Sequence, residues 1–132
     1  MIRRGFIRDQ KVLRIATVDG RGTPHVVPVW YRYSQGKFYI GTNTRTAKAR
    51  NVRRNPKVSF LIDVGVNSPD IYGVMGTGRA RLIVERSRVK SVAKSILRRY
   101  FKTLENRSAQ QLLDDTDCII EVTPKKMTSW NY

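Results

Sequence analysis

Short runs of apolar and β-branched residues alternate with turn-forming residues along most of the chain. Runs of this length and composition predict β-strands. They occupy residues 12–18, 25–33, 37–42, 58–64, 72–85 and 118–124. The connection at residues 19–24 is rich in Gly, Asp and Pro, and Gly36 belongs to the next one, so the first three runs predict an antiparallel meander.

Two features inside these strands disturb a regular ladder. Pro28 has no backbone N–H to donate, so its strand must have an edge, a bulge or a bend at that point. Gly73, Gly76 and Gly78 lie within one predicted strand, where glycines mark the sharp bends of barrel corners. Six short strands of this kind predict a closed or partly closed β-barrel.

Helical patterns occupy the segments between the later strands. Residues 46–54 include a threonine suited to an N-cap and end before Pro56. Residues 88–102, behind Ser87 as the expected cap, repeat apolar side chains at the spacing of one helix face, and residues 107–113 predict a further short helix. The opposite face of the longer helix is basic, which is typical of a solvated surface. The pattern therefore predicts a mainly β domain with accessory α-helices.

The charge of the chain is its unusual property. Its 132 residues include 26 Lys and Arg against 10 Asp and Glu, which gives a net charge of +16. This excess favours anionic partners, and a nucleic acid, an anionic cofactor or simple solubility would each account for it. The length is typical of one domain, so we expect residues 1–132 to fold as a single unit.

Membrane, disulfide and metal chemistry find little support in the sequence. No segment approaches the roughly 20 apolar residues of a membrane span, and the first residues lack the apolar stretch of a signal peptide. The single cysteine, Cys118, lies in an apolar run and predicts a small buried hydrophobe. With His25 as the only histidine, a zinc site has too few ligands. We therefore expect a cytoplasmic protein with no bound metal.

Hydroxyl and basic side chains gather where a predicted strand ends and a helix begins. This segment, residues 40–50 (IGTNTRTAKAR), contains three threonines, two arginines and Lys48. A helix N-terminus offers unpaired N–H groups and the positive end of the helix dipole, to which hydroxyls and cations add further donors. The pattern indicates a phosphate site, although a capped surface helix with solvated arginines has the same pattern.

Several segments follow one another in a characteristic order and spacing. They are residues 15–20 (IATVDG), 24–31 (PHVVPVWY), 38–40 (FYI), 48–59 (KARNVRRNPKVS), 78–80 (GRA) and 122–130 (VTPKKMTSW). Together they resemble the pyridoxamine 5′-phosphate oxidase-like superfamily of flavin and deazaflavin split barrels, over nearly the whole chain. The resemblance implies a six-stranded Greek-key split β-barrel of the FMN-binding type. It also implies a homodimer with the cofactor at the subunit interface.

The resemblance further implies which residues bind the cofactor, which is FMN or alternatively a deazaflavin. The residues that would contact its phosphate are Thr46 and Lys48, with Arg45 and Arg50 as further candidates. The residues that would lie along its ring are His25, Val26, Val27, Pro28, Gly41 and Thr42. Asn51 is a weaker candidate. Trp130 and Tyr72 are candidates to reach the ring or substrate across the interface, although a packing role fits each at least as well.

An oxidoreductase is the activity that the resemblance implies, with a hydride passing between the cofactor and a small organic substrate. No catalytic residue is assigned, because the cofactor supplies the chemistry and the lone His25 forms no relay. The carboxy-terminal signatures of true pyridoxamine phosphate oxidases are missing, and residues 24–31 look more like the branch that includes deazaflavin-dependent reductases. Two alternatives stay open. One is a basic barrel that binds RNA or DNA, and the other is a barrel that carries flavin or haem without turnover.

Overall fold

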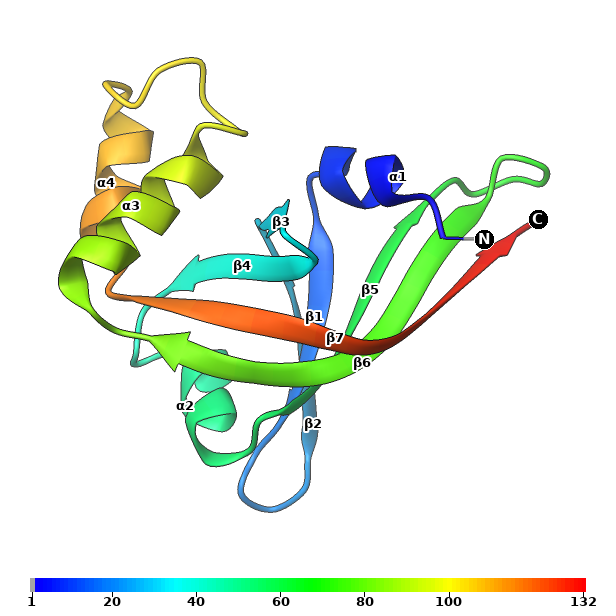
Figure 1. The fold of residues 1–132 in the computed structure, drawn as a ribbon, viewed down its shortest axis with the longest axis horizontal. Helices are drawn as coiled ribbons and strands as arrows, with labels where there is room; N and C mark the ends of the chain where they lie inside the picture. Colours follow the sequence, from blue (N-terminus) through cyan, green and yellow to red (C-terminus); the bar gives the residue numbers. More distant parts are fainter. Residues whose placement is uncertain (1) are drawn as a thin grey trace.

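One curled antiparallel sheet of seven strands forms the body of the protein in the computed structural model, which describes residues 2–132. The strands are β1 (Leu13–Val18), β2 (Pro24–Val29), β3 (Arg32–Ser34), β4 (Lys37–Thr42), β5 (Lys57–Val64), β6 (Tyr72–Ile83) and β7 (Cys118–Asn131). Their order across the sheet is β2-β1-β5-β6-β7-β4-β3, and the sheet curls into a half-barrel (Figure 1). This architecture confirms the predicted mainly β split-barrel fold.

The strand expected over residues 25–33 is divided in two, which raises the number of strands from six to seven. Its first part, β2, lies at one edge of the sheet, and its second part, β3, lies at the other. Between them Tyr31 enters the core, where its hydroxyl donates to the Ile7 carbonyl at 2.5 Å and its N–H donates to Tyr100 Oη at 2.9 Å. The edge position of β2 agrees with the prediction made from Pro28.

Four helices lie around the sheet in the described part of the chain. They are α1 (Arg4–Asp9), α2 (Ala47–Arg54), α3 (Arg86–Leu97) and α4 (Arg107–Asp115). Figure 1 shows α1 and α2 at opposite ends of the sheet, and α3 beside α4. The sequence pattern did not predict α1, because six residues are too few to show a helical period. None of the described helices has both the length and the apolar character that crossing a membrane requires.

Both ends of α3 differ from the predicted helix. Its N-cap is Glu85 and not Ser87, because the Glu85 carboxylate accepts the N–H groups of Ser87 and Arg88 at 3.2 and 2.8 Å. The helix also ends earlier than predicted. The residues that follow it include Tyr100, whose ring stacks on Trp30 at a centroid distance of 4.2 Å. The apolar period continued past the helix because these residues pack against the barrel.

The last two strands form a long, bent ribbon. β7 continues beyond residue 124, its predicted end, because it pairs with β6 along almost the whole length of both strands. The register shifts between Thr77 and Gly78. A Cβ atom at Gly78 would lie 2.5 Å from the Thr123 carbonyl oxygen, so only glycine allows this close approach. The irregularity expected from the strand glycines is therefore present at this position.

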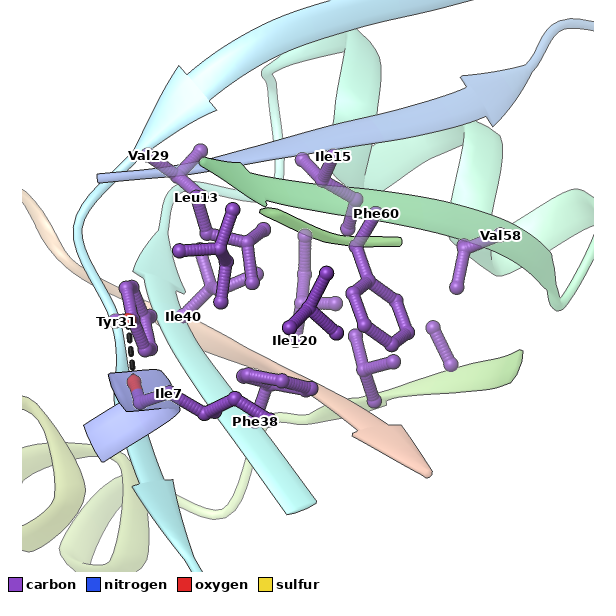
Figure 2. Close-up of a cluster of buried hydrophobic side chains, with 14 of the residues drawn as sticks. Ile7, Leu13, Ile15, Val29, Tyr31, Phe38, Ile40, Val58, Phe60 and Ile120 are labelled. Atoms are coloured by element: carbon purple, nitrogen blue, oxygen red, sulfur yellow. Dashed lines mark hydrogen bonds between the residues drawn. The ribbon is translucent and has the colours of Figure 1, made fainter. Parts of the chain in front are cut away.

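The concave side of the sheet holds the main hydrophobic core (Figure 2). Burial alternates along β1 and β5, which turns every second side chain inward. Leu13, Phe38, Phe60 and Ile120 meet there from four strands, and Ile7 joins them from α1. A second, smaller cluster lies between α3, α4 and the neighbouring strands. The alternation leaves the other side chains of β1, β5 and β6 on the outward face.

Candidate cofactor-binding site

A tight turn leads from β4 into α2 and forms the mouth of the helix. Asn43 makes this turn: its Oδ1 accepts the N–H of Arg45 at 2.9 Å and its carbonyl accepts the N–H of Thr46 at 3.0 Å. Asp117, just before β7, fixes the turn from outside, because its carboxylate accepts the N–H and the hydroxyl of Thr44 at 2.8 and 3.2 Å. Sequence reasoning missed Asp117, since nothing in the pattern links it to a turn so far away in the chain.

Two threonine hydroxyls meet at this helix mouth. Thr46 is the N-cap of α2 and accepts the N–H of Ala49 at 3.4 Å. Its Oγ1 lies 3.1 Å from Oγ1 of Thr42, the last residue of β4, which is buried. The first-turn N–H groups of an α-helix have no partner within the helix. Thr46 Oγ1 also donates to the Asn43 carbonyl at 2.9 Å, so the hydroxyls shape the mouth and its backbone N–H groups are the neutral donors that an anion could use.

Lys48 supplies the charge at the same place. It lies in the first turn of α2 and is half-buried, and this desolvation lowers the pKa of its ammonium group. None of the ion pairs found in residues 2–132 involves Lys48. A cation that has lost part of its hydration without gaining a carboxylate is a good partner for an external anion.

Asn51 has a structural role on the same helix. It lies three residues after Lys48, about one turn along one helix face. Its side chain is buried and donates from Nδ2 to Thr17 Oγ1 of β1 at 3.0 Å. This bond holds α2 against β1. Sequence reasoning listed Asn51 among the weaker cofactor candidates but missed Thr17, which looked like one more polar residue in an alternating strand.

The two arginines of this segment point away from Lys48. Arg45 is exposed and folds back on the turn, where its Nε donates to Asn43 Oδ1 at 3.2 Å. Arg50 is exposed and lies roughly 200° around the helix axis from Lys48. The structure therefore brings Thr42 and Thr46 into contact, places Lys48 in the helix turn that Thr46 caps, and leaves Arg50 on another side of the helix.

The strand predicted to run along the ring is the exposed edge strand β2. His25 pairs with Thr17, the residue that binds α2, and its side chain is exposed, so it has no packing role within the chain. Val26 is 65% exposed and Pro28 is exposed, whereas Val27 packs against the core. An apolar edge this open can accept a flat ligand or a second chain.

Val26 also lines an apolar groove on the outward face of the sheet. The groove measures about 370 Å³. Its lining includes Ala16, Val26, Leu61, Met75 and Trp130. The Trp130 ring lies over Gly73, where a Cβ atom would come within 2.3 Å of it. Trp130 thus joins Val26 on this face but does not join the group around Lys48 in the same chain.

Tyr72, a predicted candidate to reach the ring or substrate, is buried and packs within the chain. It is 7% exposed and its ring makes an edge contact with Phe6 at a centroid distance of 4.6 Å. Arg3 covers the ring at 3.5 Å, and its N–H donates to Tyr72 Oη at 3.1 Å. These contacts hold the start of the chain against the barrel.

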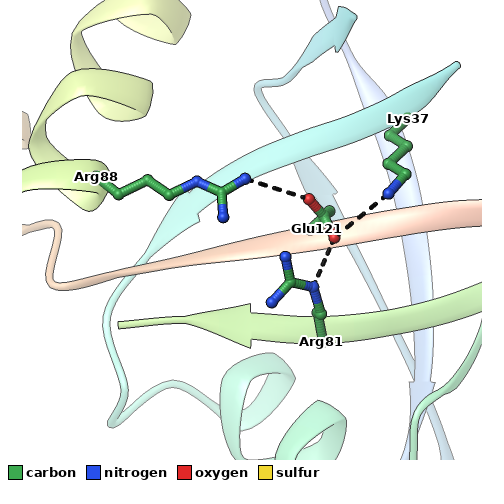
Figure 3. A network of polar contacts seen from close by, with 4 residues as sticks. All are labelled: Lys37, Arg81, Arg88 and Glu121. Carbon is green, nitrogen blue, oxygen red and sulfur yellow. Dashed lines mark hydrogen bonds and ion pairs between the residues drawn. The ribbon is translucent and has the colours of Figure 1, made fainter. Parts of the chain in front are cut away.

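The buried thiol of Cys118 and the buried carboxylate of Glu121 have structural roles. Burial raises the pKa of Cys118 to about 11, so its thiol stays protonated at neutral pH. Glu121 is the only buried carboxylate among residues 2–132, and three cations surround it (Figure 3). Arg81 Nε, Arg88 Nη2 and Lys37 Nζ lie 2.7, 3.7 and 3.9 Å from its oxygens. Neither group is placed to act as a nucleophile or a general base.

The structure is thus a split β-barrel with two threonine hydroxyls at the start of α2 and a half-buried lysine in the first turn of this helix. The pyridoxamine 5′-phosphate oxidase family model matches residues 3–131, and the chain belongs to this family. A relative from Streptomyces rimosus, a 5a,11a-dehydrotetracycline/5a,11a-dehydrooxytetracycline reductase, is 31% identical over 101 residues, which are 70% of this chain and 71% of the relative.

Solved structures show the same architecture. The conserved hypothetical protein Rv2991 from Mycobacterium tuberculosis is 27% identical and superposes with a TM-score of 0.84 over 96% of this chain and 81% of its own. The haem storage protein HutZ from Vibrio cholerae is 19% identical, with a TM-score of 0.76 over 97% of this chain and 90% of its own. The second likeness concerns the fold alone.

Proposed function

We propose that this protein is an oxidoreductase that binds FMN or a deazaflavin and transfers a hydride between that cofactor and a small organic substrate. The observation that carries the proposal is Lys48, half-buried without a carboxylate partner in the first turn of α2, the helix that Thr46 caps. A phosphate dianion at the mouth of α2 would stabilise the ammonium charge of Lys48 and accept hydrogen bonds from first-turn N–H groups of the helix. Membership of the family and the reductase relative support the same reading.

A homodimer is the second part of the proposal. Val26 and Met75 are 65% and 40% exposed on the outward face, next to Leu61 and Ala16 in the apolar groove. Pairing two such faces would remove this apolar surface from water. It would also carry Trp130 of the partner subunit toward β2, whose edge supports the ring in this proposal.

The chain contributes binding and orientation in this mechanism. A bound flavin or deazaflavin supplies the hydride chemistry at its ring. Lys48 and Thr46 would hold the phosphate, and Val27 and Pro28 would support the ring along β2. The apolar side chains around Val26 would exclude water from the reacting face. Because Cys118 and Glu121 are committed to packing and ion pairs, we assign no acid or base to either.

Replacing Lys48 tests the cofactor site. Lys48→Ala should weaken FMN or deazaflavin binding by about 1 to 3 kcal/mol, the scale of a charge-assisted hydrogen bond. Isothermal titration calorimetry with each cofactor measures this loss and shows which cofactor binds more tightly. Arg50→Ala removes the same charge from the exposed side of α2 and should leave the affinity within a factor of about two. Equal affinities in Lys48→Ala and the parent protein would refute the site.

The absorption spectrum of the purified protein separates this function from the others. A yellow protein that releases FMN or a deazaflavin on heating, identified by mass spectrometry, supports the proposal. A colourless protein that retains nucleic acid, and loses it steeply with added salt, would contradict it. A coloured protein that turns over none of a panel of electron donors and acceptors would be a carrier of flavin or haem.

A further inference from the structure

A second group of cations lies on the outward face of the sheet. Lys57 of β5 and Arg79 of β6 are direct partners across the antiparallel ladder, and Ser59 and Thr77 are the next outward pair. Side chains alternate along a strand, so these four point to the same side, while the residues between them are buried. The four line a groove of about 410 Å³ to which no residue of α2 contributes.

The bulge in the last ribbon adds a third cation. At the register shift between Thr77 and Gly78, Lys125 of β7 has no partner on β6, so it is the extra residue of the bulged strand. Bulges redirect side chains, and Lys125 lines the same groove as Lys57 and Arg79. Three adjacent strands thus each contribute one cation to one groove.

These three cations have no counter-charge in the described part of the protein. None of its ion pairs involves Lys57, Arg79 or Lys125, and no carboxylate lines the groove. Asp19, next to the lining residue Val18, accepts two backbone N–H groups of its own hairpin loop. Like charges directly opposite each other destabilise an antiparallel pair. The arrangement is therefore unfavourable until an anion occupies it.

We propose that this groove binds a polyphosphate group, separately from the cofactor site at α2. Three cations and the hydroxyls of Ser59 and Thr77 are the donors that phosphate oxygens accept from. The volume lies within the roughly 300–1,000 Å³ of small-molecule pockets. No aromatic side chain lines the groove to stack on bases, which favours a small polyphosphate over single-stranded nucleic acid. This inference goes beyond the oxidoreductase proposal and does not depend on it.

Calorimetric titration of the full chain with inorganic tripolyphosphate tests the proposal. Arg79→Gln, Lys57→Gln and Lys125→Gln should each weaken binding about tenfold or more, because each removes a charge-assisted contact. Arg98→Gln and Lys102→Gln, at exposed positions after α3, remove the same charges and should change binding less than about twofold. A parallel titration with ATP distinguishes a nucleotide from the inorganic anion, and tighter binding of ATP indicates that the groove also holds the nucleoside.

Three results would overturn the proposal. If the groove variants and the Arg98 and Lys102 variants lose equal tripolyphosphate affinity, the binding depends only on the net charge of the protein. Tighter binding of a single-stranded oligonucleotide than of tripolyphosphate, lost in the same groove variants, would make the groove a nucleic-acid contact. Displacement of tripolyphosphate by FMN would place the groove within the cofactor site. Lys48→Ala should keep its tripolyphosphate affinity, so failure of the cofactor proposal leaves this one intact.

Discussion

Two groups of three cations lie next to each other along β6 and β7. A carboxylate lies among the cations of the first group, and within residues 2–132 none lies among those of the second. In the first group Arg81 pairs across the strands with Glu121, which also contacts Lys37 and Arg88 (Figure 3). In the second group Arg79, two residues earlier on the same face, pairs with Thr123. Its neighbours Lys57 and Lys125 add charge and bring no acid.

The difference separates an internal ion cluster from an open site. Glu121 is 3% exposed and neutralises part of the charge around it, so the first group is satisfied within the fold. The second group leaves its charge to solvent or to a ligand. The cations of the first group surround a buried carboxylate, whereas the cations of the second group surround none of the described carboxylates.

The largest effect is expected at Glu121. Glu121→Gln keeps the shape of the side chain but leaves three cations around a neutral group, so the free energy of unfolding should fall by roughly 2 kcal/mol. This figure is below the usual cost of breaking a buried pair, because the three partners are half-exposed and screened by water. Urea unfolding measures it. Arg79→Gln, on the neighbouring strand β6, should stay within about 0.5 kcal/mol of the parent protein.

The pH dependence of unfolding checks the same carboxylate. Burial raises the pKa of Glu121, whereas the hydrogen bond and the charge of Arg81 lower it. The lowering effects together outweigh burial, so the net shift of the pKa is downward. A lowered pKa in the folded state gives stability that is complete above the unfolded value, about 4.3, and is lost as the pH falls through the folded value. The difference between the parent protein and Glu121→Gln should therefore shrink below pH 4. A constant difference would show that the charge of Glu121 contributes little.

A carboxylate introduced into the second group should neutralise part of its charge, as Glu121 does in the first group. Thr123 stands opposite Arg79 as Glu121 stands opposite Arg81, so Thr123→Glu places a carboxylate among the three free cations. We expect about a tenfold loss of tripolyphosphate affinity, or about 1.4 kcal/mol. Thr123→Gln, which has the same length and no charge, should bind as the parent protein does. A Thr123→Glu protein with full affinity would mean that the cations of this groove do not bind the anion.

The sequence predicted the architecture because strands and turns leave local signals. Apolar and β-branched runs at residues 12–18 and 58–64 predicted strands, and Pro28 predicted an edge, a bulge or a bend, of which the structure has the edge. The division near Tyr31 was not predictable, because residues 29–33 contain no Gly, Pro, Asn or Asp to mark a turn and the break depends on a bond to α1. Local patterns define elements, but tertiary contacts decide where long elements are interrupted.

The candidate site was predicted unevenly for the same reason. Thr46 and Lys48 belong to one contiguous segment, so their association with a helix start was visible. Asp117 and Thr17, which fix that segment, come from distant parts of the chain and carry no local signal. The groove of Lys57, Arg79 and Lys125 needed strand register and a bulge to be recognised, and neither can be read from composition.

The smallest expected effect is a gain in stability when one free cation is removed. Lys57 and Arg79 face each other without an anion between them, and like charges in this position cost about 0.2 to 1 kcal/mol. Lys57→Gln should therefore raise the free energy of unfolding by that amount in low salt without tripolyphosphate, and the gain should fade as added salt screens the repulsion. With saturating tripolyphosphate the parent protein should have the higher free energy of unfolding, because it keeps all three cations and binds the anion more tightly. Urea unfolding at two salt concentrations, with and without the anion, measures the difference between the two proteins in all four conditions. A Lys57→Gln protein that is less stable in every condition would show that Lys57 supports the fold itself.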